Sequence, residues 1–144
     1  MAEQAVEGRT FSGDDWYGDD LGGAVFIDCT FDDVDLSEVT TAGASFTGCT
    51  FRSCRFNSST HTSTAFVACE FVRCTFFDAT FDGCKVAGSS FAECTMRPLR
   101  VVGGSWRGAV LRHLRMDKLD LSGVDLRDAD LSGTDLSLTV LREA

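Results

Sequence analysis

A period of five residues runs through nearly the whole chain of 144 residues and limits the folds that it can adopt. Every fifth position from Phe11 to Leu141 gives 27 central positions, and 25 of them hold a large apolar residue. The two exceptions are Thr41 and His61. A period of five matches neither the 3.6-residue repeat of an α-helix nor the two-residue alternation of a β-strand. The chain must therefore turn a corner every five residues and point one large side chain inward on each side.

The positions before and after each central residue also favour particular residue types. The position two residues before the centre carries no charge from residue 24 onward, and it holds all 7 cysteines. Twelve of the 14 glycines lie two residues after a centre, where some tight turns demand a positive φ. Four such sides close a square, and squares stack at about the 4.8 Å spacing of paired strands. Residues 20 apart in the sequence are therefore expected to lie one above the other.

The period is clearest from Leu119 to Leu138, which reads Leu-Asp-Leu-Ser-Gly, Val-Asp-Leu-Arg-Asp, Ala-Asp-Leu-Ser-Gly and Thr-Asp-Leu-Ser-Leu. This pattern resembles the A(D/N)Lxx motif of the pentapeptide repeat family, and the resemblance covers roughly nine-tenths of the chain. The resemblance implies an all-β fold, the right-handed quadrilateral parallel β-helix. With four repeats to a turn, the chain is expected to form about six to seven coils.

Stacking predicts four inner columns of side chains, three of which are apolar throughout. In the remaining column Thr41 and His61 are neighbours, so they are placed to hydrogen-bond to each other inside the core. The surrounding run, residues 57–64, is the most polar of the chain. We interpret it as a local bulge rather than a ligand site.

The cysteines also stack, Cys29, Cys49 and Cys69 in one column and Cys54, Cys74 and Cys94 in another. A metal site is disfavoured because the chain has only two histidines and neither shares a column with these thiols. Disulfides are disfavoured because side chains one turn apart hold their Cβ atoms about 4.8 Å apart, wider than a bridge prefers. We interpret each cysteine as a small hydrophobe that fills the inner site.

Both ends of the stack depart from the pattern. Arg9, Asp14 and Asp19 occupy the inward small-residue position, so residues 1–22 are expected to form an N-terminal cap or an irregular first coil, and residues 23–144 the β-helix. No capping helix follows the last repeat, and solenoid ends need a cover. We therefore predict an end-to-end dimer; the alternative is that a covering segment is missing. The expected dimer interface consists of Leu136, Leu138, Val140 and Leu141.

Charge is distributed unevenly along the expected rod. Residues 1–38 hold eleven acidic residues and one arginine, residues 39–116 four acidic and nine basic residues, and residues 117–144 seven acidic and three basic residues. Both ends are thus acidic, and the middle segment of residues 39–116, which we call the waist, is mildly basic. One acidic residue lies on each side of the turn from 117 to 136. The acidic surface expected to bind a partner comprises Asp15, Asp20, Asp35, Asp120, Asp125, Asp130 and Asp135.

Several function classes are disfavoured by composition. A net charge of −9 argues against direct binding to nucleic acid or to acidic membrane surfaces. No apolar run approaches the ~20 residues of a membrane span, and the first ten residues lack a signal peptide's basic and apolar regions, so we expect a cytoplasmic protein. The glycines follow the repeat and not a phosphate-binding motif, and no catalytic constellation is visible. We expect a protein that is not an enzyme, with no cofactor and no metal.

Local segments point to a function within the family. The stretches 29–36, 46–51 and 91–99, the last of which contains Arg97-Pro98-Leu99, resemble segments of the MfpA/Qnr-type fluoroquinolone-resistance proteins. That resemblance implies a rod that binds DNA gyrase, a type II topoisomerase, as a mimic of duplex DNA. It implies altered supercoiling or protection from quinolones, a role in antibiotic self-resistance, and a homodimer through the C-terminal ends.

A protein-interaction rod with an unrelated partner is the alternative. Its basis is an outward apolar group, Val67, Val72 and Phe77, on consecutive sides of one coil. The basic waist also departs from what a full-length mimic of DNA requires. The sequence leaves both hypotheses open.

Overall fold

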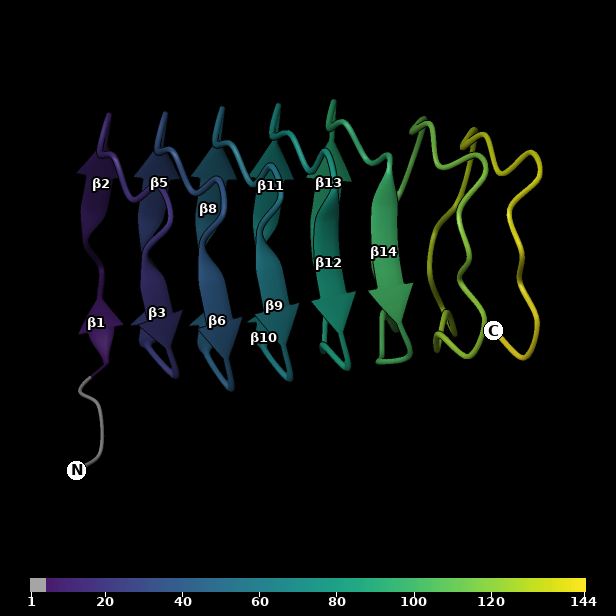
Figure 1. Ribbon diagram of the computed structural model, residues 1–144, viewed down its shortest axis with the longest axis horizontal. Helices are drawn as coiled ribbons and strands as arrows, with labels where there is room; N and C mark the ends of the chain where they lie inside the picture. Colours follow the sequence, from purple (N-terminus) through teal and green to yellow (C-terminus); the bar gives the residue numbers. More distant parts are fainter. Residues whose placement is uncertain (1–4) are drawn as a thin grey trace.

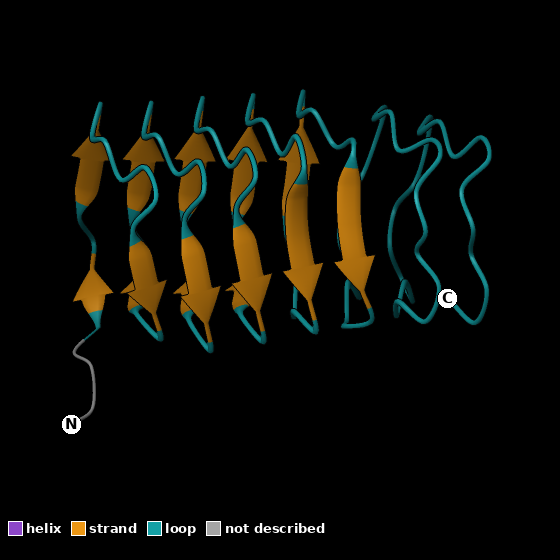
Figure 2. Cartoon of the chain, viewed as in Figure 1, coloured by secondary structure: helices purple, strands orange, loops and turns teal. Residues whose placement is uncertain are grey.

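The computed structural model describes residues 5–144, which form a rod of stacked square turns (Figures 1 and 2). Residues 1–4, among them Glu3 of the acidic N-terminal segment, lie outside the described part. The described residues contain no helix, and all of their strand pairs are parallel. The prediction of a quadrilateral parallel β-helix is confirmed.

Three sides of the square are parallel sheets, whose strands recur once per turn. The first wall consists of β1 (Val6–Glu7), β4 (Val25–Ile27), β7 (Ser45–Thr47) and β10 (Ala65–Val67). The second wall consists of β2 (Thr10–Ser12), β5 (Thr30–Asp32), β8 (Thr50–Arg52), β11 (Glu70–Val72) and β13 (Ser90–Ala92). The fourth wall consists of β3 (Asp20–Gly22), β6 (Thr40–Ala42), β9 (Thr60–Thr62), β12 (Ala79–Asp82) and β14 (Leu99–Val102).

The third wall, which the chain reaches between the second and fourth walls, is held by isolated parallel bridges such as Asp15 with Asp35. Partners on the walls are 20 residues apart, with a single register shift between Asp20 and Gly22. Beyond β14 the walls continue to Ala144 through isolated bridges alone. The sheets contain four or five strands, one from each turn, so regular strands extend over about five turns. This number is slightly smaller than the six to seven coils predicted from the length of the chain.

Each corner of the square is formed by the residue two positions after a centre, and nearly all of these residues have a positive φ. Glycine serves at eleven corners, Gly43 with φ of 72° for example, as predicted from its spacing. Fifteen residues other than glycine adopt the same conformation, among them Asp28, Ser58 and Leu138. The corner therefore accepts several residue types, and the repeat continues where glycine is absent.

The core consists of the stacked central residues. Phe31, Phe51, Phe71 and Phe91 form one column, with ring centroids 4.6 to 4.8 Å apart and interplanar angles of 4 to 8°. A stacked pair adds about 0.5–1.5 kcal/mol to the stabilisation that its buried area provides. The column is dry and continuous, as the 20-residue spacing predicts.

The Thr41–His61 contact expected from the column is confirmed, since Thr41 Oγ1 lies 2.8 Å from His61 Nδ1. Thr64 Oγ1 lies 2.7 Å from the same hydroxyl, and His61 Nε2 lies 3.0 Å from Ser59 Oγ. The predicted bulge is wrong, because β9 pairs with β6 and β12 without any shift. The polar side chains satisfy one another inside the core, so the strand stays regular.

All seven cysteines are free thiols, and six of them are fully buried. Each thiol faces the carbonyl of the turn before, for example Cys54 Sγ to Phe31 O at 3.2 Å and Cys84 Sγ to His61 O at 3.2 Å. Ser89 uses the same site, where its hydroxyl donates to Phe66 O at 2.8 Å. Cysteine here is a small buried residue that also contributes a weak S–H donor.

Residues 5–22, for which the sequence predicts a cap or an irregular first coil, form β1, β2 and β3 and pair with the next turn in parallel register. The charged side chains of Arg9 and Asp19 are exposed, and Asp14 is half-buried. Arg9 lies over the ring of Phe11, 5.4 Å from its centroid. Since no turn of the described chain lies before this one, the inward position opens to solvent and accepts charge.

One interval between turns lacks the regular hydrogen-bond ladder. On the third wall the N–H of a central residue donates to the carbonyl 19 residues later, as Phe76 does to Thr95 at 2.9 Å. The described backbone shows no such bond from Met96 to Arg115. The next corner is Pro98, which has no N–H to donate, whereas Lys118 at the corner above donates to Ser137 at 2.9 Å.

The same interval is open on the fourth wall. Within the described backbone neither Val101 nor Gly103 donates to the turn above, and Asp120 does not donate to Leu99. β14 is consequently an edge strand on this side. The first and second walls remain bonded across the interval, for example from Phe91 N–H to Val110 O at 3.0 Å. We call the open interval between residues 93–103 and residues 112–122 the seam.

Candidate partner-binding surfaces

The N-terminal acidic residues lie on outward positions and are oriented by their own backbone. Asp15, Asp20 and Asp35 each accept the N–H two residues later through Oδ1, at 2.9 to 3.0 Å. Asp15 and Asp35 occupy successive turns of the third wall. Partial burial opposes ionisation of Asp35, but the N–H and hydroxyl of Ser37 and the charge of Arg55 outweigh it and lower the pKa of this carboxyl. The carboxyl of Asp35 is therefore ionised, and the hydrogen bonds hold all three side chains against the wall.

The four C-terminal acidic residues repeat this geometry, one on each wall. Asp120, Asp125, Asp130 and Asp135 accept the N–H two residues later at 2.9 to 3.0 Å. Hydrogen bonds from the Arg127 side chain and backbone lower the pKa of Asp125 to about 2. The bonds from Ser132 and Arg112 lower the pKa of Asp130 to about 2 as well. Regularly spaced, fully ionised carboxylates thus surround this end of the rod.

Arginines divide the seven acidic residues into two groups. Arg127 binds both oxygens of Asp125, at 2.9 and 2.8 Å, and Arg112 binds Asp130 at 2.5 Å. Arg55 lies 3.9 Å from Asp35. Within residues 5–144 no salt bridge involves Asp15, Asp20, Asp120 or Asp135. Of the seven, the carboxylates without a salt bridge are therefore two near each end, with Arg142 acting on Asp120 and Arg115 on Asp135 from a longer distance.

The basic waist is partly neutralised by pairs that span neighbouring turns. Arg55 lies 3.0 Å from Asp33, and Arg107 lies 3.3 Å from Asp128. These side chains are largely exposed, so each pair contributes little to stability. They do reduce the positive potential that the residue count of the waist suggests.

The outward apolar group does not form one continuous patch. Val67 on the first wall and Val72 on the second wall are half-buried, whereas Phe77 on the third wall is 55% exposed. Phe77 lies instead beside a pocket at the seam, with Pro98. The sequence identified the exposed aromatic residue but not its neighbours.

The C-terminal end exposes apolar side chains. Leu138 is 79% exposed, Val140 41% and Leu141 43%, and Leu136 is half-buried. No turn of the described chain covers this face. These are the residues for which the sequence predicts a dimer interface, and the interface stays a prediction.

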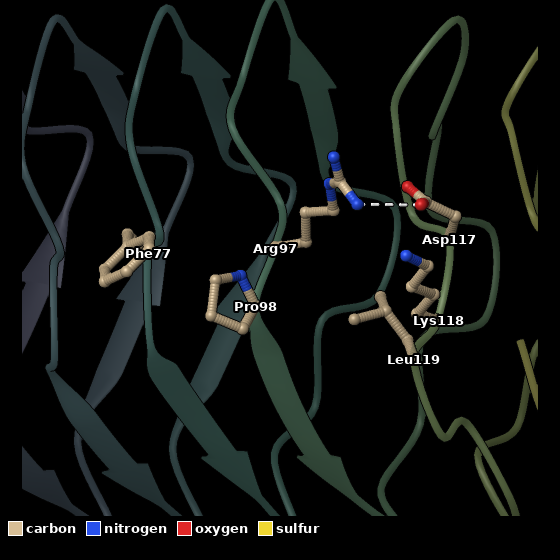
Figure 3. Close-up of a pocket in the computed structure, with 6 residues that line it drawn as sticks. All are labelled: Phe77, Arg97, Pro98, Asp117, Lys118 and Leu119. Atoms are coloured by element: carbon tan, nitrogen blue, oxygen red, sulfur yellow. Dashed lines mark hydrogen bonds and ion pairs between the residues drawn. The ribbon is translucent and has the colours of Figure 1, made fainter.

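Three pockets lie along the seam, with volumes of about 350, 370 and 410 Å³. The first lies between Phe77 and Pro98 on one side and Lys118 and Leu119 on the other. The Arg97–Asp117 ion pair, 2.7 Å long, spans the seam beside it (Figure 3). Neither the seam nor its pockets emerged from the sequence, although the single proline of the chain marks the place.

The two histidines of the chain lie in different surroundings. His61 hydrogen-bonds Ser59, but both side chains are fully buried, and burial lowers the pKa of His61 to about 3. His113 is exposed at a corner. Among residues 5–144 no group of three or more His, Cys, Asp or Glu side chains is placed to hold a metal ion. The part of the chain that the structure describes also contains no helix suited to crossing a membrane.

Comparison with known sequences identifies the repeat. A family model described as pentapeptide repeats matches eight copies, over residues 29–59 and 105–144. The intervening residues 60–104 lie outside the match, although their strands pair in the same 20-residue register. No curated protein matches the chain.

Comparison with solved structures identifies the fold. A trypsin-treated variant of QnrB1, described as a plasmid-mediated fluoroquinolone resistance protein, superposes with a TM-score of 0.56 and 18% identity. The alignment covers 95% of this chain and 72% of that one. A second trypsin-treated variant of QnrB1 gives a TM-score of 0.50 and 17% identity, with the same coverage. At these identities the likeness concerns the fold.

Proposed function

We propose that this chain, a pentapeptide repeat protein by its sequence and its fold, binds DNA gyrase, a type II topoisomerase, as a mimic of duplex DNA. It acts without catalysis, by occupying a basic surface built for phosphates, and so modulates supercoiling or protects the enzyme from quinolone-like poisons. The observation that carries the proposal is the set of outward carboxylates, each oriented by a backbone N–H and repeated at the spacing of the turns. The sequence resemblance to MfpA/Qnr-type proteins and the name of the structural neighbour support it.

The arginine pairing sharpens the proposal. Asp125 and Asp130 form salt bridges within the described chain, whereas Asp15, Asp20, Asp120 and Asp135 form none. A basic partner gains more from an uncompensated carboxylate, and attraction of this kind weakens as salt is added. We therefore assign most of the binding to the unpaired carboxylates at the two ends.

The test is a gyrase supercoiling assay with and without a fluoroquinolone, at two salt concentrations. Asp120→Asn with Asp135→Asn, and Asp15→Asn with Asp20→Asn, remove charge but keep the oxygen that accepts the backbone N–H. The matched control is Asp78→Asn with Asp82→Asn, two exposed acidic residues of the waist. We expect salt-sensitive inhibition or drug protection that the end variants lose and the control retains. Equal activity of all three double variants would refute the DNA-mimic surface.

We propose further that the protein is a homodimer joined through its C-terminal ends. Leu138, Val140 and Leu141 are exposed on a face that continues the core, and covering it removes apolar surface from water. Such a dimer would place unpaired carboxylates along a longer rod. The interface variant described below tests this arrangement.

The second candidate is an interaction rod with an unrelated partner, and the exposed Phe77 favours it. Aromatic side chains at the centre of an interface commonly dominate its energy. If Phe77→Asp removed a partner that the wild-type chain captures, while gyrase remained unaffected by either protein, this candidate would replace the first.

A further inference from the structure

The seam exposes backbone groups whose counterparts one turn further along, the N–H groups of Leu121 and Gly123 for example, are paired. On its lower edge the N–H groups of Val101 and Gly103 and the carbonyl of Leu99 have no backbone partner in the turn above, within the described chain. On the upper edge the N–H of Asp120 is equally without one. Unpaired strand edges are templates for another strand. We propose that the seam binds an extended acidic peptide segment of a partner protein, which adds as a strand along the free edge of β14.

Strand geometry determines which groups such a segment meets. Leu99 and Val101 point into the core and are 7% exposed, whereas Arg100 and Val102 point outward. A segment along this edge would receive N–H donors from Val101 and Gly103 and donate to the Leu99 carbonyl. These bonds are sequence-independent, and they supply affinity for an extended backbone.

The side chains around the seam select negative charge. No salt bridge of the described chain involves Arg100, Arg115 or Lys118. Two of the acidic residues nearby are engaged, Asp117 with Arg97 at 2.7 Å and Glu93 with Arg73 at 3.8 Å, whereas Asp120 lines the same pocket as Arg100 without a salt bridge. Three cations without a salt bridge thus line a groove that holds one such anion, Asp120, and an acidic segment complements the excess of positive charge.

The pockets provide room for side chains at intervals along the groove. The pocket beside Phe77 and Pro98 is apolar on that side and carries Lys118 opposite, as Figure 3 shows. Asp117, which is 6% exposed, keeps one carboxylate oxygen, Oδ1, without any hydrogen-bond partner. A segment that alternates acidic and apolar residues would place its apolar side chains in these pockets and its carboxylates against Arg100, Arg115 and Lys118.

The test uses a fluorescein-labelled peptide of ten residues that alternates valine and glutamate, and a matched peptide that alternates valine and lysine. Binding is measured by fluorescence anisotropy, and amide hydrogen exchange locates it. We expect the glutamate peptide alone to bind and to slow exchange at Val101, Gly103 and Asp120 about tenfold or more. Arg100→Glu and Arg115→Glu should each weaken binding about tenfold, whereas Arg52→Glu on β8, an exposed arginine outside the seam, should not.

Four outcomes would overturn the proposal. They are equal binding of the lysine peptide, protection of amides away from the seam, insensitivity to both charge reversals, and no binding of the glutamate peptide at millimolar concentration. Protection of the seam amides that rises with protein concentration alone would assign the groove to a second copy of this chain instead. Because amide protection is measured on the wild-type protein, misfolding of a variant does not affect this part of the test. The upper edge of the seam includes the backbone N–H of Asp120, whose side chain belongs to the proposed gyrase-binding surface. Peptide binding is measured without gyrase, so failure of either proposal is distinguishable from failure of the other.

Discussion

The hydroxyl oxygen of Thr41 lies 2.8 Å from Nδ1 of His61, one turn further along the same buried column. The Ser59 hydroxyl donates to the Phe56 carbonyl at 2.7 Å, so its oxygen accepts from His61 Nε2. This assignment leaves Nδ1 as the acceptor for Thr41. The imidazole is therefore neutral, with both nitrogens satisfied, in a core whose other large, fully buried side chains are apolar or aromatic.

This burial makes stability depend on pH. Burial lowers the pKa of His61 to about 3 in the folded chain, whereas an unfolded histidine titrates near 6.5. Between these pH values the unfolded state binds a proton that the folded state does not. The contribution of buried His61 to stability is therefore fully present above about pH 6.5, and the free energy of unfolding falls by roughly 1 kcal/mol per pH unit as the pH drops toward 3. We expect His61→Phe to reduce this slope in urea unfolding at several pH values. An unchanged slope would show that other groups cause it.

Alanine substitutions at two glycines distinguish the stability cost of backbone strain from that of steric overlap. Gly104 has a φ of +87°, and an added Cβ would lie 2.4 Å from the carbonyl oxygen of Cys84. Gly123 has a φ of +73° with nothing within 4 Å of that position. We expect Gly123→Ala to cost about 1 kcal/mol, as a left-handed residue does, and Gly104→Ala on the order of 3 kcal/mol or more. Equal losses in chemical denaturation would contradict the close approach of these turns.

The cysteines should differ in reactivity. Cys94 lines a seam pocket and is the one cysteine that is not fully buried, and a hydrogen bond from Cys74 lowers its pKa. The neighbouring thiols of Cys54 and Cys94, together with burial, raise the pKa of Cys74. Iodoacetamide should therefore modify Cys94 first in the native protein, as followed by mass spectrometry of peptides. Cys94→Ser should remove the fast phase, and modification of Cys74 at the same rate would show that the stack opens there.

The proposed C-terminal dimer predicts that a single substitution on its interface weakens self-association. Leu138→Asp places a charge on the exposed C-terminal face, and we expect sedimentation equilibrium to show conversion of dimer to monomer with at least a tenfold weaker association. Val102→Asp, a similar change at an exposed position on the fourth wall, serves as the control. A dimer that survives Leu138→Asp, or that dissociates equally in the control, would place the interface elsewhere.

The period determined much of this structure in advance. Because central residues 20 apart must stack, the columns that contain Phe51 and His61 followed from counting, and the Thr41–His61 contact followed with them. The polar run around His61 was misread as a bulge, because the partner of Ser59, the carbonyl of Phe56, is a backbone group that a side-chain pattern does not reveal.

The seam and the charge pairing depend on geometry that the repeat does not encode. Pro98 stands at a corner where a donor is required, but its effect on two walls follows only from the three-dimensional ladder. Arg127 lies two residues after Asp125 and was a visible signal for a pair, whereas Arg112 reaches Asp130 across a turn. Positions of long side chains on a regular scaffold are not set by the period, so the unpaired carboxylates had to be found in the structure.

The seam also determines how the rod deforms. Within the described chain, backbone hydrogen bonds join the turns on either side of it on the first and second walls, through contacts such as Trp106 N–H to Asp125 O at 2.8 Å, while the Arg97–Asp117 side-chain pair spans the open side. The first and second walls therefore act as a hinge, and the turns can separate on the third and fourth walls. The rod is consequently most compliant at this place, where bending toward the corner between the first and second walls opens the seam without breaking a backbone hydrogen bond.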